Sequence, residues 1–125
     1  MPKIRNVGTK TIERDGKTVG RVDYYESAGQ EGTCICNLYV EEAYRRQGIG
    51  SALVEEVLRD SKTQPPFFAY IRANRRGVLN QGSYQLFLKL GFKPINKLGL
   101  QIGDDGERYK VMEETQSYKI SKIIL

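Results

Sequence analysis

Hydrophobic and polar positions alternate in short segments along the first forty residues, and this pattern predicts strands. Residues 9–14 and 17–25 read as two strands joined by Asp15-Gly16, a pair typical of a tight hairpin turn. Residues 26–33 contain few apolar groups and read as a turn. Residues 34–40 are nearly continuous in thiol, aliphatic and aromatic side chains, which is typical of a strand buried on both faces in the middle of a sheet.

The pattern then changes to the period of a helix. Apolar residues recur at three- and four-residue spacings over residues 49–58, and charged residues lie opposite them. Pro65-Pro66 ends this helical region, and residues 67–71 return to a strand. A second helix is predicted between Asn80, a favoured N-cap residue, and Gly91, a natural C-terminal stop.

The last part of the chain predicts a hairpin. Residues 92–95 and 100–102 are extended, residues 103–106 turn the chain, and residues 108–112 return. The order is three strands, helix, strand, helix and hairpin, which predicts an α/β fold with a mixed sheet and helices covering its faces. A chain of 125 residues is typical of one domain with one core, so we expect a single domain over residues 1–125.

Composition excludes several classes of protein. The chain contains no histidine, which excludes Ser-His and Cys-His nucleophilic machinery and removes the commonest transition-metal ligand, so no metal site is expected. Cys34 and Cys36 lie two apart on one strand, a poor geometry for a disulfide, and are interpreted as reduced packing residues or, alternatively, as nucleophiles. No apolar run approaches the roughly 20 residues that span a bilayer, and the N-terminus carries no cleavage signal. These features favour a soluble, cytoplasmic protein.

The net charge of +5 is concentrated in one segment. Residues 65–97 contain six basic residues and no acidic residue. This distribution favours a localised anion-binding site, and the alternative is a solvated basic face.

The junction between the third strand and the first helix carries the candidate chemistry. The strand ends at Val40, a polar loop follows, and the helix begins among glycines. The first turn of a helix has unpaired N–H groups that attract anions, and glycine at positions 48 and 50 lets a phosphate approach them. Arg45 and Arg46 add charged, forked donors. We therefore predict a pyrophosphate site, with close helix-to-strand packing as the alternative role of the glycines.

Two motifs resemble the GCN5-related N-acetyltransferase (GNAT) superfamily. Arg45-Arg46-Gln47-Gly48-Ile49-Gly50 is similar to its core signature Arg/Gln-x-x-Gly-x-Gly/Ala. Asn80-x-x-Ser83-x-x-x-Phe87-x-x-x-Gly91-Phe92 is similar to its later pattern Asn-x-x-Ala-x-x-x-Tyr-x-x-x-Gly-Phe. The resemblance covers residues 10–114. It implies a mixed, mostly antiparallel sheet with splayed central strands and flanking helices, in a short version that lacks the usual N-terminal helices.

The resemblance also implies an acetyl-coenzyme A site in the gap between residues 34–40 and 67–72. The pantetheine arm would pair with the backbone near Leu38 and Val40, and the Val40 amide would polarise the thioester carbonyl. Arg72, Arg75 and Arg76 are candidates for the 3′-phosphate. The implied cofactor-binding residues are Leu38, Tyr39, Val40, Arg45, Arg46, Gln47, Gly48, Ile49, Gly50, Ser51, Asn80 and Phe87.

The proton-transfer groups depart from the family pattern. The family's usual tyrosine, which returns a proton to the thiolate, aligns with Phe87. Tyr84, one turn earlier, is a candidate replacement, and its alternative role is core packing. Glu41 and Glu42 are the nearest candidates for a general base, and each is alternatively a solvated loop charge.

Three functions remain open at this point. The first is acetyl transfer to a primary amine of a small molecule or a protein. The second is a non-catalytic acyl-coenzyme A sensor or scaffold, supported by Phe87. The third is a basic nucleic-acid-binding domain, which we rank last because aromatic and basic residues do not alternate in residues 65–97. The apolar extension at residues 115–125 covers the domain's own sheet or pairs with a second copy, giving a homodimer.

Overall fold

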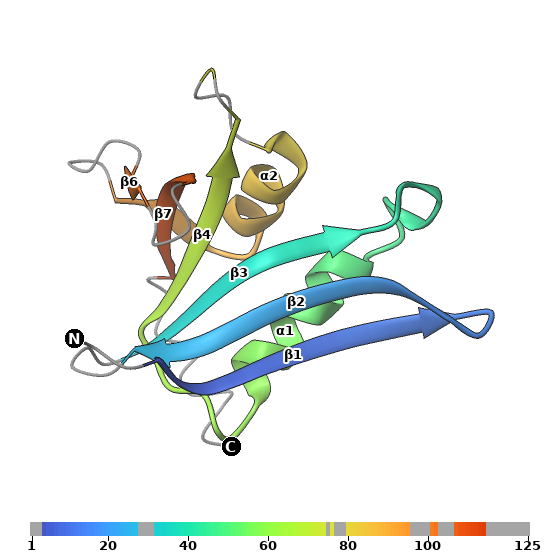
Figure 1. Cartoon of the computed structure of the whole chain (residues 1–125), viewed down its shortest axis with the longest axis horizontal. Coiled ribbons are helices and arrows are strands. Elements are labelled where there is room, and N and C mark those ends of the chain that lie inside the picture. Colours follow the sequence, from blue (N-terminus) through green and yellow to red (C-terminus); the bar gives the residue numbers. More distant parts are fainter. Residues whose placement is uncertain are drawn as a thin grey trace.

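The protein folds around one mixed sheet. The computed structural model describes residues 4–27, 32–74, 76, 80–95, 101–102 and 107–114. The strands are β1 (Ile4–Arg14), β2 (Lys17–Ser27), β3 (Thr33–Val40), β4 (Phe67–Ala73), β5 (Phe92–Pro94), β6 (Gln101–Ile102) and β7 (Arg108–Glu114). The helices are the short 3-10 turn η1 (Glu42–Tyr44), α1 (Ile49–Arg59) and α2 (Gln81–Lys89). The sheet has the strand order β1-β2-β3-β4-β7-β5, and β6 also pairs with β7 (Figure 1).

The first two strands form a long antiparallel hairpin, as the sequence predicts. Asp15 and Gly16 have φ angles of 53° and 78°, the left-handed values that a tight hairpin turn requires. The hairpin begins at Ile4 and ends at Ser27, so it is longer than the sequence pattern indicates. Because this two-residue turn joins β1 directly to β2, the predicted absence of helices between the first strands is confirmed.

The central strands β3 and β4 are parallel neighbours that separate along their length. They pair only from Thr33 and Phe67 to Ile35 and Ala69. Beyond these pairs the two strands diverge (Figure 1), which confirms the predicted splay. The divergence begins where Asn37 adopts a φ angle of 53° and where the β2–β3 ladder changes register. An irregularity of this kind bends one strand away from its neighbour.

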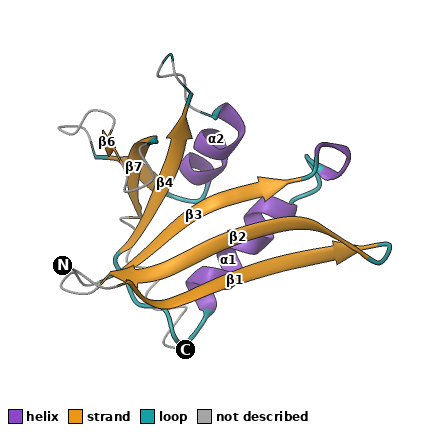
Figure 2. Ribbon diagram, in the orientation of Figure 1, coloured by secondary structure: helices purple, strands orange, loops and turns teal. Residues whose placement is uncertain are grey.

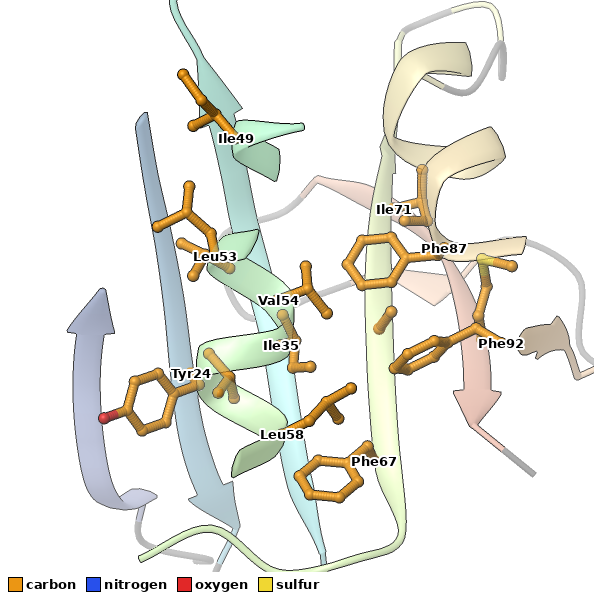
Figure 3. Close-up of a cluster of buried hydrophobic side chains, with 14 of the residues drawn as sticks. Tyr24, Ile35, Ile49, Leu53, Val54, Leu58, Phe67, Ile71, Phe87 and Phe92 are labelled. Atoms are coloured by element: carbon orange, nitrogen blue, oxygen red, sulfur yellow. The ribbon is translucent and has the colours of Figure 1, made fainter. Parts of the chain in front are cut away.

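Both α-helices pack against the same face of the sheet, so the prediction that helices cover both faces is wrong for the described residues. Ile35 of β3 and Ile71 of β4 point into one cluster with Val54 of α1 and Phe87 of α2 (Figure 3). A parallel β3-α1-β4 connection places its helix on one side of the sheet, and α2 returns to that side after β4 (Figure 2). Fully buried α1 residues at three- and four-residue spacings confirm the helical pattern: Leu53, Val54 and Val57.

The second helix and the C-terminal hairpin follow the predicted order. The Asn80 side chain caps α2 by accepting a hydrogen bond from the Ser83 N–H at 3.1 Å. Gly91 follows the helix with a φ angle of 97°, as a C-terminal stop does. The predicted turn at residues 103–106 and the extension at residues 115–125 lie outside the described residues. Among the helices that the structure describes, none is long and apolar enough to span a bilayer.

Candidate functional site

A pocket of about 250 Å³ fills the gap between the separated strands. Its walls come from three elements of the sheet and from α2. The lining residues are Cys36, Asn37, Leu38, Tyr39, Tyr70, Ile71, Arg72, Asn80, Ser83, Phe87 and Tyr109. Four residues predicted from the sequence as cofactor-binding lie in this wall, namely Leu38, Tyr39, Asn80 and Phe87. The pocket thus lies between β3 and the second motif, whereas Val40 and residues 45–51, also predicted as cofactor-binding, are not part of its described lining.

Beyond Ile35, the backbone of β3 presents to the gap an edge that forms no ladder with any strand among the described residues. The Glu41 N–H donates to the Val19 carbonyl of β2 at 2.8 Å. Backbone groups of successive residues in an extended strand point to opposite edges, so those of Val40 and Leu38 point to the edge that β4 has left. The Val40 carbonyl accepts a hydrogen bond from Arg45 Nε at 2.8 Å. An extended chain lying in the gap would meet the N–H of Val40 and both backbone groups of Leu38.

The two glycines at the start of α1 have different roles. Gly48 is the N-cap residue with a φ angle of 78°, and a Cβ at this position would meet nothing within 4 Å. The space in front of the first turn is therefore open, as an anion site requires. A Cβ on Gly50, in contrast, would lie 2.7 Å from Leu86 Cδ1 of α2. The alternative considered for both glycines was close packing of the helix on a strand. The close contact at Gly50 is instead with α2, and packing does not explain Gly48.

The loop before α1 is held by the tip of the β1–β2 hairpin. The Tyr44 hydroxyl donates to Asp15 Oδ2 at 3.3 Å, and Lys17 Nζ lies 5.4 Å from the centre of the Tyr44 ring. Lys17 Nζ also lies 3.7 Å from Glu41 Oε2, an ion pair too long for a hydrogen bond. These contacts connect the hairpin to the segment that leads into Gly48.

Two basic residues lie beside the open turn. The Arg45 guanidinium lies 5.7 Å from the centre of the exposed Tyr39 ring, in addition to its bond to Val40. Arg46 is exposed and has a φ angle of 67°. Gln47 is exposed, while Ile49 is buried against the core and Ser51 is half-buried. The exposed residues of the motif thus lie at the N-terminus of α1.

The two candidate positions for a proton donor, Phe87 and Tyr84, differ in whether they line the pocket. Phe87 lines the pocket and packs edge-to-face on Phe92 at 5.0 Å, with only 2% of its surface exposed. Tyr84 is absent from the pocket wall and packs against the core cluster, which was its alternative role. Neither Glu41 nor Glu42 lines the pocket, so the structure does not bring the candidate general bases to it.

Two tyrosines that we did not single out from the sequence line the pocket. Tyr70 of β4 and Tyr109 of β7 have ring centroids 6.1 Å apart. Burial raises the pKa of Tyr70, and the neighbouring Cys34 raises it further. The alternation of residues 67–72 predicts that Tyr70 lies on the face opposite the core. No sequence signal brings Tyr109 beside it, because their contact depends on the β4–β7 register.

The cysteines are thiols without a disulfide, in agreement with the sequence analysis. Burial raises the pKa of the Cys34 thiol, although hydrogen bonds with Tyr25 and Tyr70 oppose this effect. A raised pKa keeps a thiol protonated at neutral pH and disfavours it as a nucleophile. Packing is thus the better interpretation of Cys34.

The charged residues predicted for a 3′-phosphate occupy different places. Arg72 lines the pocket and forms an ion pair with Glu107 at 2.8 Å. Arg76 is exposed after β4, and its N–H donates to Asn74 Oδ1 at 2.9 Å. Arg75 lies outside the described residues. Within the described part of the chain, no group of three Cys, Asp or Glu residues could hold a metal ion.

Comparisons with known proteins agree with this geometry. The sequence profile of the acetyltransferase (GNAT) domain matches residues 9–94. A solved acetyltransferase of the GNAT family from Desulfovibrio desulfuricans is 17% identical, with a TM-score of 0.65 over 86% of this chain and 68% of that chain. An aminoglycoside 6′-N-acetyltransferase complexed with coenzyme A is 17% identical, with a TM-score of 0.65 over 86% of this chain and 71% of that one.

A protein-modifying enzyme shares the fold as well. The ribosomal-protein-S18-alanine N-acetyltransferase from Escherichia coli is 19% identical, with a TM-score of 0.57 over 88% of this chain and 70% of that chain. At these identities the structural matches establish the fold alone. No curated protein matches the chain in sequence.

Proposed function

Since the chain belongs to the GNAT acetyltransferase domain family, we propose that it transfers the acetyl group of acetyl-coenzyme A to a primary amine. The observation that carries this proposal is the continuity between an open helix N-terminus and an unpaired strand edge. Gly48 leaves the first turn of α1 accessible, and the edge of β3 leads from that turn into the pocket.

The residues around this path suit a coenzyme A thioester. The N–H groups that begin α1 at Gly48, together with Arg46, would hold the pyrophosphate. The edge of β3 at Leu38 and Val40 would pair with an extended amide-containing arm as an added strand does. When bound, the thioester supplies the activated acetyl group.

The Val40 N–H carries the main catalytic role in this proposal. It points to the gap and would donate a hydrogen bond to the thioester oxygen, where negative charge develops during attack by the amine. The amine and the thioester would be held on either side of the gap, so positioning would supply most of the rate. Attack forms the new C–N bond and breaks the C–S bond, so coenzyme A leaves as its thiolate; the nitrogen loses a proton to water, and water protonates the thiolate.

A calorimetric titration with acetyl-coenzyme A tests the binding half of the proposal. Saturable binding by the wild-type protein that is lost in Gly48→Glu is the expected result, because a carboxylate would occupy the open space before α1. Transfer is then measured with a panel of primary amines by the release of thiol. Failure to bind coenzyme A thioesters at millimolar concentration would overturn the whole proposal.

A non-catalytic acyl-coenzyme A sensor is the second candidate, and Phe87 favours it. A phenylalanine cannot return a proton to a thiolate, and this side chain lies in the pocket wall. The same two assays separate the candidates, because a sensor binds the thioester with the affinity of an enzyme yet shows no turnover with any amine.

A further inference from the structure

The pocket has two chemically different walls, one on each face of the sheet. Ile71 and Phe87 belong to the core cluster on the helix-covered face (Figure 3). Leu38 also faces the helices, because its Cδ2 lies 4.0 Å from a Cβ built on Gly50. Residues that alternate with these along β3 and β4 face the opposite side, which no described helix covers.

The wall on this opposite side is rich in tyrosine. Tyr39 alternates with Leu38 and is 56% exposed. Tyr70 alternates with Ile71, and Tyr109 pairs directly with Arg72 in the β4–β7 ladder, which places it on the same face. We refer to Tyr39, Tyr70 and Tyr109 as the tyrosine wall.

Carboxylates are absent from the described pocket lining, and two carboxylates that contact lining residues are engaged in hydrogen bonds or an ion pair. Asp23 accepts hydrogen bonds from Asn37 at 3.0 Å, Thr9 at 2.8 Å and Arg21 at 3.1 Å. Burial by itself would raise the pKa of Asp23, but these hydrogen bonds hold that pKa below its ordinary value. The second, Glu107, pairs with Arg72. An acceptor amine in the pocket therefore meets aromatic rings and hydroxyls.

This composition determines which amines suit the pocket. An amine attacks only as the neutral base, and a neighbouring carboxylate would stabilise the ammonium form and delay its deprotonation. An aromatic wall attracts the ammonium weakly and removes water from it, which lowers its pKa toward the reactive form. A second or third positive charge on the acceptor would have no carboxylate partner in the described lining. It would also be repelled by Arg72, which lies in the segment of residues 65–97 that contains six basic residues and no acidic residue.

We propose that the acceptor is a single primary amine carried on an aromatic or apolar body, which binds against the tyrosine wall on the face opposite the helices. This inference rests on the proposed acetyl transfer. It assigns the acceptor specificity to Tyr39, Tyr70 and Tyr109, and it excludes polyamines and other polycationic amines as preferred acceptors.

A competition between two amines tests the inference. Phenethylamine carries one amine on an aromatic body, and spermidine carries three amines on an aliphatic chain. The expected kcat/KM for phenethylamine exceeds that for spermidine at least about ten-fold at low ionic strength, because spermidine is repelled there. A higher kcat/KM for spermidine would overturn the inference and leave the proposed acetyl transfer intact.

A pair of variants at one position tests the role of the wall. Tyr70→Leu removes the ring and is expected to raise the KM for phenethylamine about ten-fold, whereas Tyr70→Phe keeps the ring and is expected to change it less than about three-fold. The affinity for coenzyme A, measured by calorimetry, should be unchanged in both variants, which also verifies that they are folded. Equal KM values in Tyr70→Leu and wild type, or equal losses in both variants, would refute the assignment. If the wild type acetylates another amine of the panel and not phenethylamine, this inference alone fails. If it binds coenzyme A and acetylates no amine of the panel, the catalytic proposal fails with it.

Discussion

Gly48 offers the sharpest test of the coenzyme A site, because a small and a charged substitution there have different expected effects. Gly48→Ala places a Cβ in open space at a φ angle of 78°. The left-handed conformation costs an ordinary residue roughly 1–2 kcal/mol, so the free energy of unfolding should fall by about that amount. The strain is the same in the free and bound protein, and the affinity for coenzyme A should therefore change little.

Gly48→Glu adds the same strain and brings a negative charge to the helix start. Repulsion between two like charges 4 Å apart amounts to about 1 kcal/mol in water and about 4 kcal/mol near a protein surface. Because each 1.4 kcal/mol is a ten-fold change, these energies correspond to a rise in the dissociation constant of about five-fold to several hundred-fold. Calorimetry measures the affinities, and urea unfolding measures the stabilities. Equal affinities of Gly48→Ala and Gly48→Glu would refute the reasoning, since only the charge and reach of the side chain distinguish them.

Three further predictions concern the packing and the electrostatics. Gly50→Ala should lower the free energy of unfolding by about 1–3 kcal/mol, because the added methyl group would collide with Leu86. Leu86→Ala should relieve that collision. A double-mutant cycle in which the two effects simply add would contradict the contact. Phe87→Ala should lower the free energy of unfolding by about 3–5 kcal/mol because the ring is 2% exposed, and a loss below about 1 kcal/mol in chemical denaturation would show that the site is not packed. Asp60 pairs with Lys10 at 2.8 Å, and hydrogen bonding from Lys10 holds the pKa of Asp60 below its ordinary value. The contribution of Asp60 to stability is thus present above the unfolded pKa of about 3.9 and is lost as the pH falls through the lower folded value. Asp60→Asn should therefore be less stable than wild type at pH 6, and the difference should shrink below pH ~4. A difference in stability that does not change with pH would count against the ion pair.

Local sequence determined most of the elements, and its errors have a common cause. The turn at Asp15 and Gly16 and the cap at Asn80 depend on a few neighbouring residues, and both were predicted correctly. The hairpin extends to Ile4 and Ser27, which no alternation predicted, because cross-strand pairing holds those residues in strands. The prediction of helices on both faces was wrong because periodicity identifies the buried side of a helix without stating which face of the sheet it meets.

The residues of the candidate site also differ in whether local sequence or tertiary contacts identify them. Gly48 and Asn80 were found from motifs in which the side chain, or its absence, acts on the adjacent backbone. Tyr70 and Tyr109 were missed, because they are brought within 6.1 Å of each other only by the β4–β7 register. Tyr84 was placed one helical turn from Phe87 correctly, yet it faces the core while Phe87 lines the pocket.

By itself, the sequence determined that a strand runs through a polar loop into a glycine-rich helix start. It did so because turn preference, capping and hydrophobic period act over a few residues. The prediction that residues 34–40 are buried on both faces holds only for the first part of the strand, because Asn37 and Tyr39 are exposed. Only the tertiary structure decided where β3 and β4 separate, that Gly50 serves helix packing while Gly48 stays open, and that tyrosines from three strands share one wall. These features depend on strand register and on contacts between residues far apart in the chain, which short-range patterns do not encode.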